Sequence, residues 1–349
     1  MNRTDMNRTE LADLVDELIH RPEAEGVTLG VLVSVDGAIL AEAYGRQPDT
    51  AFGPGGPVSP SDTLISWSMA KSITHALIGI AVDDGLLDLA ARAPVSEWRG
   101  TPTEGITLLD LLEMRSGLAF VEDYVDGATS DCIHMLFSGE EARGVDDMGA
   151  YAATRPVLHE PGTVWSYSSG TTNIVCRILG DTIAGGGVEA VGSEQRRTSM
   201  LRFMQERLFG PAGMPSAVAR FDATGTFIGS SFVYAELRDF WRFGELYRLD
   251  GVSTTGQRVL PAGWRDQGRT FVAHDPDGAG PTGFDYGRHW WMWPDLPGSM
   301  AAQGYQGQFT LVLPEHGVTL VHLGVTDVGV APTLVSRLGD IARTAAGLL

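Results

Sequence analysis

The sequence predicts an α+β fold in which an antiparallel sheet is built from both ends of the chain and flanked by helices. Strand-like segments with turn signals occur near both termini, whereas apolar residues in the middle recur at helical spacing. The 349 residues, 43% of them hydrophobic, suffice for a large core. We therefore expect an N-terminal part of the sheet region (1–62), a mainly helical region (63–250) and a C-terminal part (251–349), together forming one domain.

The strongest strand signal is a hairpin close to the N-terminus. Apolar runs at 27–35 and 38–44 are joined by Asp36-Gly37, a dipeptide typical of two-residue hairpin turns. A helix over 10–20, capped by Thr9, precedes the hairpin. Near the C-terminus we expect an aromatic strand over 286–293 and a second hairpin formed by 309–313 and 318–324. A closing amphipathic helix is expected over 332–349.

The middle of the chain reads as helices. One starts at Ser68 and ends at Asp84-Gly85. A second covers 107–114, with Thr107 and Asp110 placed as a capping box. Further helices are expected over 171–183, 200–208 and 235–247. The Gly-rich stretch 185–198 is expected to be a surface insertion.

Composition narrows the function classes. A net charge of −19 disfavours nucleic acids and anionic membranes as partners. No apolar run is long enough to span a bilayer, and the polar start lacks a secretory signal, so we expect a cytoplasmic protein. The two cysteines, Cys132 and Cys176, form no metal-type pair and are expected to be buried free thiols. No metal or other cofactor is expected, and the oligomeric state is left open.

Lysine usage is the most unusual feature of the composition. Of the 25 basic residues, 24 are arginine, and Lys71 is the only lysine. A guanidinium stays protonated in proteins, whereas a desolvated amine can lose its proton near neutral pH. We infer that this position needs an amine that can act as a base.

Ser68 and Lys71 stand three residues apart at the start of a helix, so their side chains share one face. A serine hydroxyl becomes a strong nucleophile when a base takes its proton. The helix N-terminus adds positive potential and backbone donors for a developing negative charge. We therefore interpret Ser68 as a nucleophile and Lys71 as its base.

Two further segments fit this chemistry. Tyr167, in the run Tyr167-Ser168-Ser169, carries a phenol that can relay a proton to a leaving group. The second segment is Gly304-Tyr305-Gln306-Gly307-Gln308, which leads into a strand. Its glycines allow close approach to a substrate, and the backbone amides of Gln308 and Ser68 are the candidate oxyanion hole.

These motifs resemble those of the penicillin-recognising serine hydrolases, a broad family of class C β-lactamases, DD-peptidases and related esterases. The resemblance rests on Ser68-Met69-Ala70-Lys71-Ser72, on 84–89 and on the block 107–118. The stretch 120–124 is closer to the carboxylesterase and 6-aminohexanoate-dimer hydrolase branch. The resemblance implies a β-lactamase/transpeptidase-like fold with the active site in a groove between an α/β and a helical region. It also implies an acyl-enzyme on Ser68, with Lys71 and Tyr167 handling protons.

Two positions depart from the family pattern. Ser169 stands where class C enzymes have an asparagine that contacts the acyl group. Tyr305 stands where β-lactamases and DD-peptidases have a lysine for the substrate carboxylate, which argues against β-lactams. Together with Gln306 and Gly307, these two residues are candidates for substrate binding. In the dimer-hydrolase branch a loop tyrosine closes over the substrate, and Tyr124 is the candidate here.

We therefore predict a serine esterase or amidase that cleaves a small carboxylic ester or amide through an acyl-enzyme. The alternatives are a true β-lactamase or DD-peptidase and an acyltransferase of the same fold. A non-catalytic sensor is disfavoured because Ser68, Lys71 and Tyr167 occur together.

Overall fold

An eight-stranded antiparallel sheet draws its strands from both ends of the chain, which confirms the predicted fold class. The structure is a computed structural model that describes residues 3–50, 53–123 and 130–347. The strand order is β2-β1-β13-β12-β11-β10-β9-β8, so the N-terminal β1 lies between its hairpin partner and a C-terminal strand. The strands are β1 Val27–Val35, β2 Ala38–Tyr44, β8 Ala273–Asp275, β9 Phe284–Tyr286, β10 Trp291–Met292, β11 Met300–Gly304, β12 Gln308–Leu313 and β13 Val318–Val325.

The first hairpin is as the sequence predicts. Asp36 and Gly37 both have positive φ, +48° and +78°, as a type I′ turn requires. The predicted aromatic strand over 286–293 is instead two short strands, β9 and β10, because His289 adopts φ +60° and interrupts the ladder. The second hairpin is confirmed as β12 and β13.

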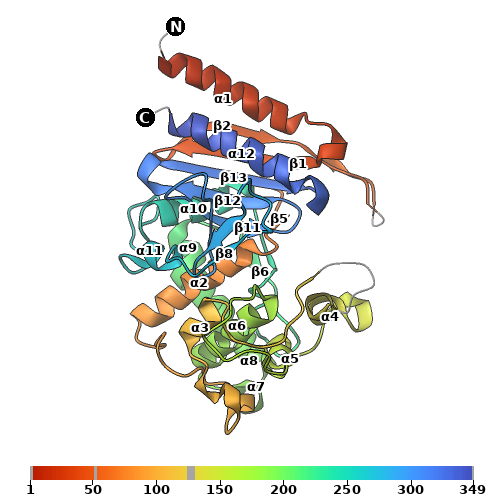
Figure 1. Cartoon of the computed structure of the whole chain (residues 1–349), viewed down its shortest axis with the longest axis vertical. Coiled ribbons are helices and arrows are strands. Elements are labelled where there is room, and N and C mark those ends of the chain that lie inside the picture. Colours follow the sequence, from red (N-terminus) through yellow and green to blue (C-terminus); the bar gives the residue numbers. More distant parts are fainter. Residues whose placement is uncertain (1–2, 51–52, 124–129, 348–349) are drawn as a thin grey trace. The chain divides into compact units, whose positions relative to one another are not determined.

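Helices cover both faces of this sheet. Helices α1 (Arg3–Ile19) and α12 (Ala331–Ala346) lie along one face, where Leu18 and Leu338 join the main apolar core (Figure 1). Helix α10 (Leu237–Arg248) packs on the other face through Gly244, where an added Cβ would lie 2.6 Å from Thr319 Cγ2. Helix α1 begins earlier than predicted, at Arg3, so the expected cap residue Thr9 lies inside it.

The chain divides into two compact units. Unit 1 comprises residues 1–69, 210–217 and 234–349 and contains the sheet; unit 2 comprises 70–209 and 218–233 and is mainly helical. Helix α10 belongs to unit 1, whereas the sequence-based boundary after residue 250 placed it in the helical region. Its contacts with β12 and β13 account for the difference.

The remaining α-helices and strands are α2 Met69–Asp83, α3 Leu108–Leu112, α4 Asp131–Phe137, α5 Met148–Ala153, α6 Ser169–Ala184, α7 Val188–Val191, α8 Ser193–Met204, α9 Gly210–Ala212, α11 Trp264–Gly268, β3 Arg46–Gln47, β4 Gly56–Pro57, β5 Leu64–Ile65, β6 Val218–Ala219 and β7 Val233–Ala235.

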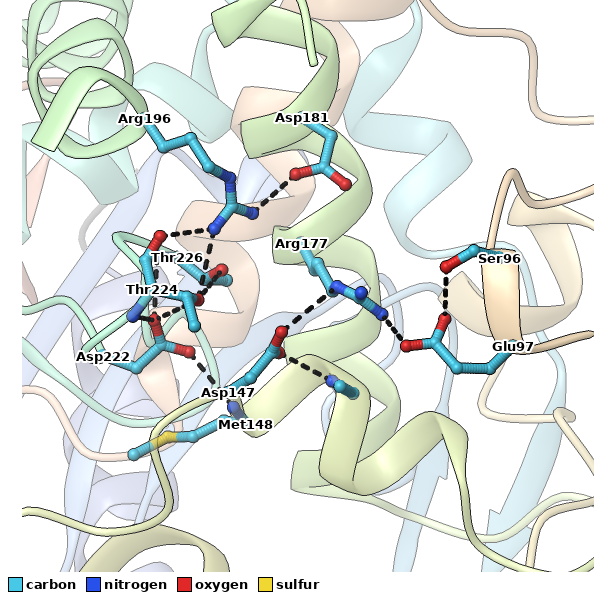
Figure 2. Close-up of polar contacts among 11 residues, drawn as sticks. Ser96, Glu97, Asp147, Met148, Arg177, Asp181, Arg196, Asp222, Thr224 and Thr226 are labelled. Atoms are coloured by element: carbon cyan, nitrogen blue, oxygen red, sulfur yellow. Dashed lines mark hydrogen bonds and ion pairs between the residues drawn. The ribbon is translucent and has the colours of Figure 1, made fainter. Parts of the chain in front are cut away.

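Unit 2 contains a partly buried polar framework around α6, shown in Figure 2. Arg177 pairs with Glu97 at 2.7 Å and with Asp147 at 3.5 Å. Arg196 on α8 pairs with Asp181 at 2.6 Å and donates to the Thr224 carbonyl. The expectation of a surface insertion over 185–198 is therefore wrong in part, because the Arg196 side chain is only 1% exposed.

Two local predictions hold in the structure. Thr107 and Asp110 form the capping box of α3. Cys132 and Cys176 are buried free thiols. Within the described residues, no helix has the length and apolar character that crossing a membrane requires.

Candidate active site

Ser68 directly precedes α2 and follows a strained turn in unit 1. Trp67 has φ +43°, a left-handed conformation that a bulky side chain rarely adopts. The Met69 amide donates to the Ser66 carbonyl at 3.2 Å, and the Ser66 hydroxyl donates to the Trp67 carbonyl at 2.9 Å. Strain of this kind persists when surrounding contacts impose it, and it clusters at functional sites.

The end of β11 supplies one of these contacts. A Cβ added to Gly304 would lie 2.3 Å from the Ser66 carbonyl oxygen and 3.1 Å from Trp67 Cβ. Only glycine therefore allows the two backbones to approach this closely. Close approach of the glycines of this segment toward a substrate, expected from the sequence, stays a prediction; the structure shows that Gly304 approaches the turn before Ser68.

The turn between β11 and β12 is pinned to the sheet by a side chain. Gln308 is buried; its Nε2 donates to the Gly324 carbonyl at 2.7 Å and to the Tyr305 carbonyl at 3.0 Å. Its Oε1 accepts from the Gly324 amide at 3.0 Å. The Thr326 amide donates to the Gln306 carbonyl at 3.0 Å. The sequence singled out Gln308 for its backbone amide, and the structure adds this anchoring role for its side chain.

Tyr305 lies at the tip of that turn. Its side chain is 39% exposed, and its ring meets Trp67 edge to face with centroids 5.8 Å apart. Gln306 and Gly307 follow with φ +62° and +84°. The third-motif turn, residues 304–308, and the residues just before Ser68 are thus packed together within unit 1.

Lys71 lies in the first turn of α2, within unit 2, and is 2% exposed. Its ammonium donates to Ser169 Oγ at 3.0 Å and to the Ser230 carbonyl at 3.0 Å. Nζ also lies 4.8 Å from the centroid of the Tyr167 ring. The structure therefore brings together the three predicted residues of this unit: Lys71, Tyr167 and Ser169.

Helix α6 positions the tyrosine motif. Ser168 is its N-cap, and its hydroxyl accepts from the Thr171 amide at 3.0 Å. The helix begins at Ser169, two residues earlier than predicted. This start fixes Tyr167 immediately before the helix and Ser169 in its first turn.

Sequence reasoning missed a carboxylate beside this motif. Glu122 accepts from the Ser169 amide at 2.7 Å and from the Ser169 hydroxyl at 2.6 Å. Sequence reasoning also missed the Ser230 carbonyl, because a backbone acceptor leaves no signature in side-chain spacing. Glu122 lies in the stretch 120–124, which resembles one branch of the family. That resemblance was the one signal that could have pointed to Glu122. Tyr124, the candidate loop tyrosine, lies outside the described residues.

Cys176 is a buried thiol in unit 2 and an alternative nucleophile to consider. Its sulfur lies 3.6 Å from the hydroxyl of Thr74, a residue of α2. Burial raises the pKa of Cys176 to about 12, so the sulfur stays a thiol at neutral pH. In the part of the chain that the structure describes, no three His, Cys, Asp or Glu side chains gather as a metal site requires.

Comparisons with known proteins place these observations in a family. The family model described as Beta-lactamase matches residues 11–330. The 6-aminohexanoate-dimer hydrolase of Paenarthrobacter ureafaciens is 26% identical over 333 residues, covering 92% of this chain and 77% of that protein. The structure resembles "Putative 6-aminohexanoate-dimer hydrolase from Bacillus anthracis" with a TM-score of 0.70, 22% identity, and coverage of 95% and 81% of the two chains. It also resembles EstCE1, a hydrolase with promiscuous acyltransferase activity, with a TM-score of 0.70, 15% identity, and coverage of 98% and 100%.

The fold and the match over most of the chain define a serine hydrolase of the β-lactamase fold. The chain belongs to the beta-lactamase family. This confirms the resemblance inferred from the Ser68–Ser72 motif.

Proposed function

We propose that the protein hydrolyses a small carboxylic ester or amide through an acyl-enzyme on Ser68. The observation that carries this proposal is the state of Lys71: the only lysine is buried, held by two acceptors, and lies in the first turn after Ser68. A lysine needed only for charge would be replaceable by arginine, which the chain uses everywhere else.

The reaction begins when Ser68 Oγ attacks the substrate carbonyl carbon and its proton passes to Lys71 Nζ. The carbonyl oxygen becomes an oxyanion, which the backbone amides of Ser68 and Gln308 bind. Lys71, with Tyr167 as relay, then delivers the proton to the leaving alcohol or amine as the carbon–heteroatom bond breaks. Water attacks the acyl-serine in the second half, its proton goes to the same base, and Ser68 recovers its hydrogen.

The substrate is a small molecule without a carboxylate at the position that Tyr305 faces. A phenol cannot supply the positive charge that would balance that carboxylate, and the chain has no second lysine. The relative from Paenarthrobacter ureafaciens is named for an amide dimer, which supports amides beside esters. The net charge of −19 supports a small substrate over nucleic acid or an anionic membrane, and the cytoplasm is the compartment we propose.

The test is intact-mass detection of acyl adducts on the purified protein and on Ser68→Ala. Short-chain p-nitrophenyl esters, their anilide analogues and a β-lactam form the panel, and a fluorophosphonate probe reports the nucleophile independently. We expect ester and probe adducts on the wild type and none on Ser68→Ala. Absence of any adduct on the wild type, or persistence of adducts on Ser68→Ala, would refute the proposal.

The same experiment separates the alternatives. Turnover of nitrocefin at rates comparable with esters would indicate a true β-lactamase. Partitioning of the acyl-enzyme to an added alcohol or amine, in place of water, would indicate an acyltransferase. Resemblance to EstCE1 makes this second comparison worth including from the start.

A further inference from the structure

Glu122 makes a two-point contact with the first residue of α6. Its Oε2 accepts from the Ser169 amide at 2.7 Å, and its Oε1 accepts from the Ser169 hydroxyl at 2.6 Å. Ser169 is fully buried. A serine hydroxyl has one hydrogen, and this one is committed to the carboxylate. Toward any other neighbour the Ser169 oxygen can therefore only accept.

That neighbour is Lys71. Its Nζ donates to Ser169 Oγ at 3.0 Å and to the Ser230 carbonyl at 3.0 Å. A neutral amine has two hydrogens and one lone pair. When these two acceptors take both hydrogens, the lone pair is left to receive a proton. Because the Ser169 hydroxyl points its hydrogen at Glu122, its oxygen accepts a hydrogen from the Lys71 amine. This orientation leaves the nitrogen lone pair to act as the base.

The two residues on either side of Ser169, Lys71 and Glu122, can carry opposite charges. Once Lys71 has taken a proton, an ammonium and the Glu122 carboxylate are separated by a single hydroxyl, and both face a buried serine. An opposite charge at this range favours the charged form of an ionisable group. Glu122 therefore balances the positive charge that forms on Lys71 during acylation.

We propose that Glu122 is a positioning residue that acts on Lys71 through Ser169, fixing the orientation of the amine and balancing its charge. This inference rests on the proposed function. It gives a role to Ser169, which stands in place of the family's asparagine: a hydroxyl can accept from lysine while it donates to the carboxylate.

A purely structural role makes a different prediction. The bond from the Ser169 amide to Glu122 caps the N-terminus of α6 and would by itself stabilise that helix. A cap alone affects thermal stability, and it leaves the protonation behaviour of Lys71 unchanged. The test must therefore measure how the rate depends on pH.

The first experiment compares Glu122→Gln with Asp123→Asn, its matched control at the exposed neighbouring position. Both variants remove one negative charge. For Glu122→Gln we expect kcat/KM for ester acylation to fall about 10- to 100-fold, and the acidic limb of the pH profile to move to lower pH by about one unit. The shift has this sign because loss of the carboxylate lets the amine lose its proton at lower pH. Asp123→Asn should change neither.

The second experiment is a double-mutant cycle with Ser169→Ala, which removes the bridging hydroxyl and keeps the backbone amide. If Glu122 acts through Ser169, adding Glu122→Gln to Ser169→Ala should cost less than about threefold in rate. An equal cost in both backgrounds, or an unshifted pH profile accompanied by a lower melting temperature, would overturn the proposal in favour of a cap. Acylation of the wild type and its loss in Ser68→Ala are measured first, so failure of the proposed function is recognised separately.

Discussion

The His322 imidazole holds the carbonyl of Gly307 in the third-motif turn. Nδ1 lies 2.6 Å from that oxygen, and Nε2 lies 2.9 Å from the Thr28 hydroxyl. Because a carbonyl can only accept, Nδ1 carries the hydrogen. Burial, together with the positive charge of Arg21, lowers the pKa of His322 to about 3. A neutral imidazole thus anchors the turn that contains Tyr305.

This anchor predicts acid sensitivity. An unfolded histidine titrates near pH 6.5 and the folded one near 3, so the unfolded state binds more protons between these values. The stabilisation is complete above pH 6.5 and is lost as the pH falls toward 3. Between pH 6.5 and 4 the wild type should lose about 3 kcal/mol more than His322→Gln, whose amide can still donate to Gly307. Urea unfolding at four pH values measures this difference; parallel profiles would contradict it.

The close approach at Gly304 predicts a severe effect from one methyl group. In Gly304→Ala the added carbon would meet the Ser66 carbonyl at 2.3 Å, so the turn before Ser68 must move. We expect a loss of about 100-fold in acylation rate, because a displaced nucleophile costs orientation. Melting temperature measured on the same protein shows whether the fold is retained.

Gly329→Ala is the matched control for that change. It lies in unit 1, has no atom within 4 Å of an added Cβ, and has no positive φ. It should keep wild-type activity. Equal activity in the two variants would show that the backbone contact at Gly304 is not required for acylation.

The buried carboxyl of Asp222 in unit 2 predicts that stability changes with pH in the opposite direction to the effect of His322. Burial raises its pKa to about 6, against hydrogen bonds from Thr224, Thr226 and Met148 that favour the ionised form (Figure 2). The folded state therefore binds more protons than the unfolded state between pH 4 and 6. Its contribution to stability is present below pH 4 and is lost as the pH rises through 6.

Relative to Asp222→Asn, the wild type should therefore lose about 2–3 kcal/mol of unfolding free energy between pH 4 and 6.5. The absolute stability of the variant will also differ, since an amide replaces one acceptor with a donor. The informative quantity is the difference in slope between the two profiles. A slope that is the same in both proteins would assign the effect to other carboxylates.

Features set by neighbouring residues could be predicted from the sequence. The Asp36-Gly37 turn, the capping box of α3 and the Ser68–Lys71 spacing each depend on a few consecutive residues. That the sheet is built from both ends of the chain also followed, because strand-like segments occur near both termini, whereas the order of its strands was not predicted. One prediction failed because it depended on residues that are distant in the sequence. Arg196 reads as a solvated charge in a Gly-rich stretch, and its burial depends on Asp181 and Thr224, which are distant in sequence.

The candidate site shows the same limit. Lys71 was recognisable because it is unique, and Tyr167 because it precedes a helix. Glu122 was not, since it reaches Ser169 across 47 residues and no spacing rule joins them. The Ser230 carbonyl has no side-chain signature at all. What the sequence could not supply is therefore the set of partners that orient the base.

These partners make replacement of Lys71 informative. Arginine at this position keeps a positive charge and N–H donors for Ser169 Oγ and the Ser230 carbonyl, and it cannot lose its proton. If Lys71 is the base, Lys71→Arg should lower the acylation rate by about 1000-fold or more, as much as Lys71→Met.

Arginine is larger than lysine in a site where Lys71 is 2% exposed, so the comparison needs a readout independent of size. Small primary amines added to Lys71→Ala provide one, because removal of the side chain beyond Cβ leaves room for them beside Ser169. The rate should rise in proportion to the concentration of the unprotonated amine. Proportionality to the protonated form, or substantial activity in Lys71→Arg, would mean that this position supplies charge and that the proton from Ser68 goes elsewhere.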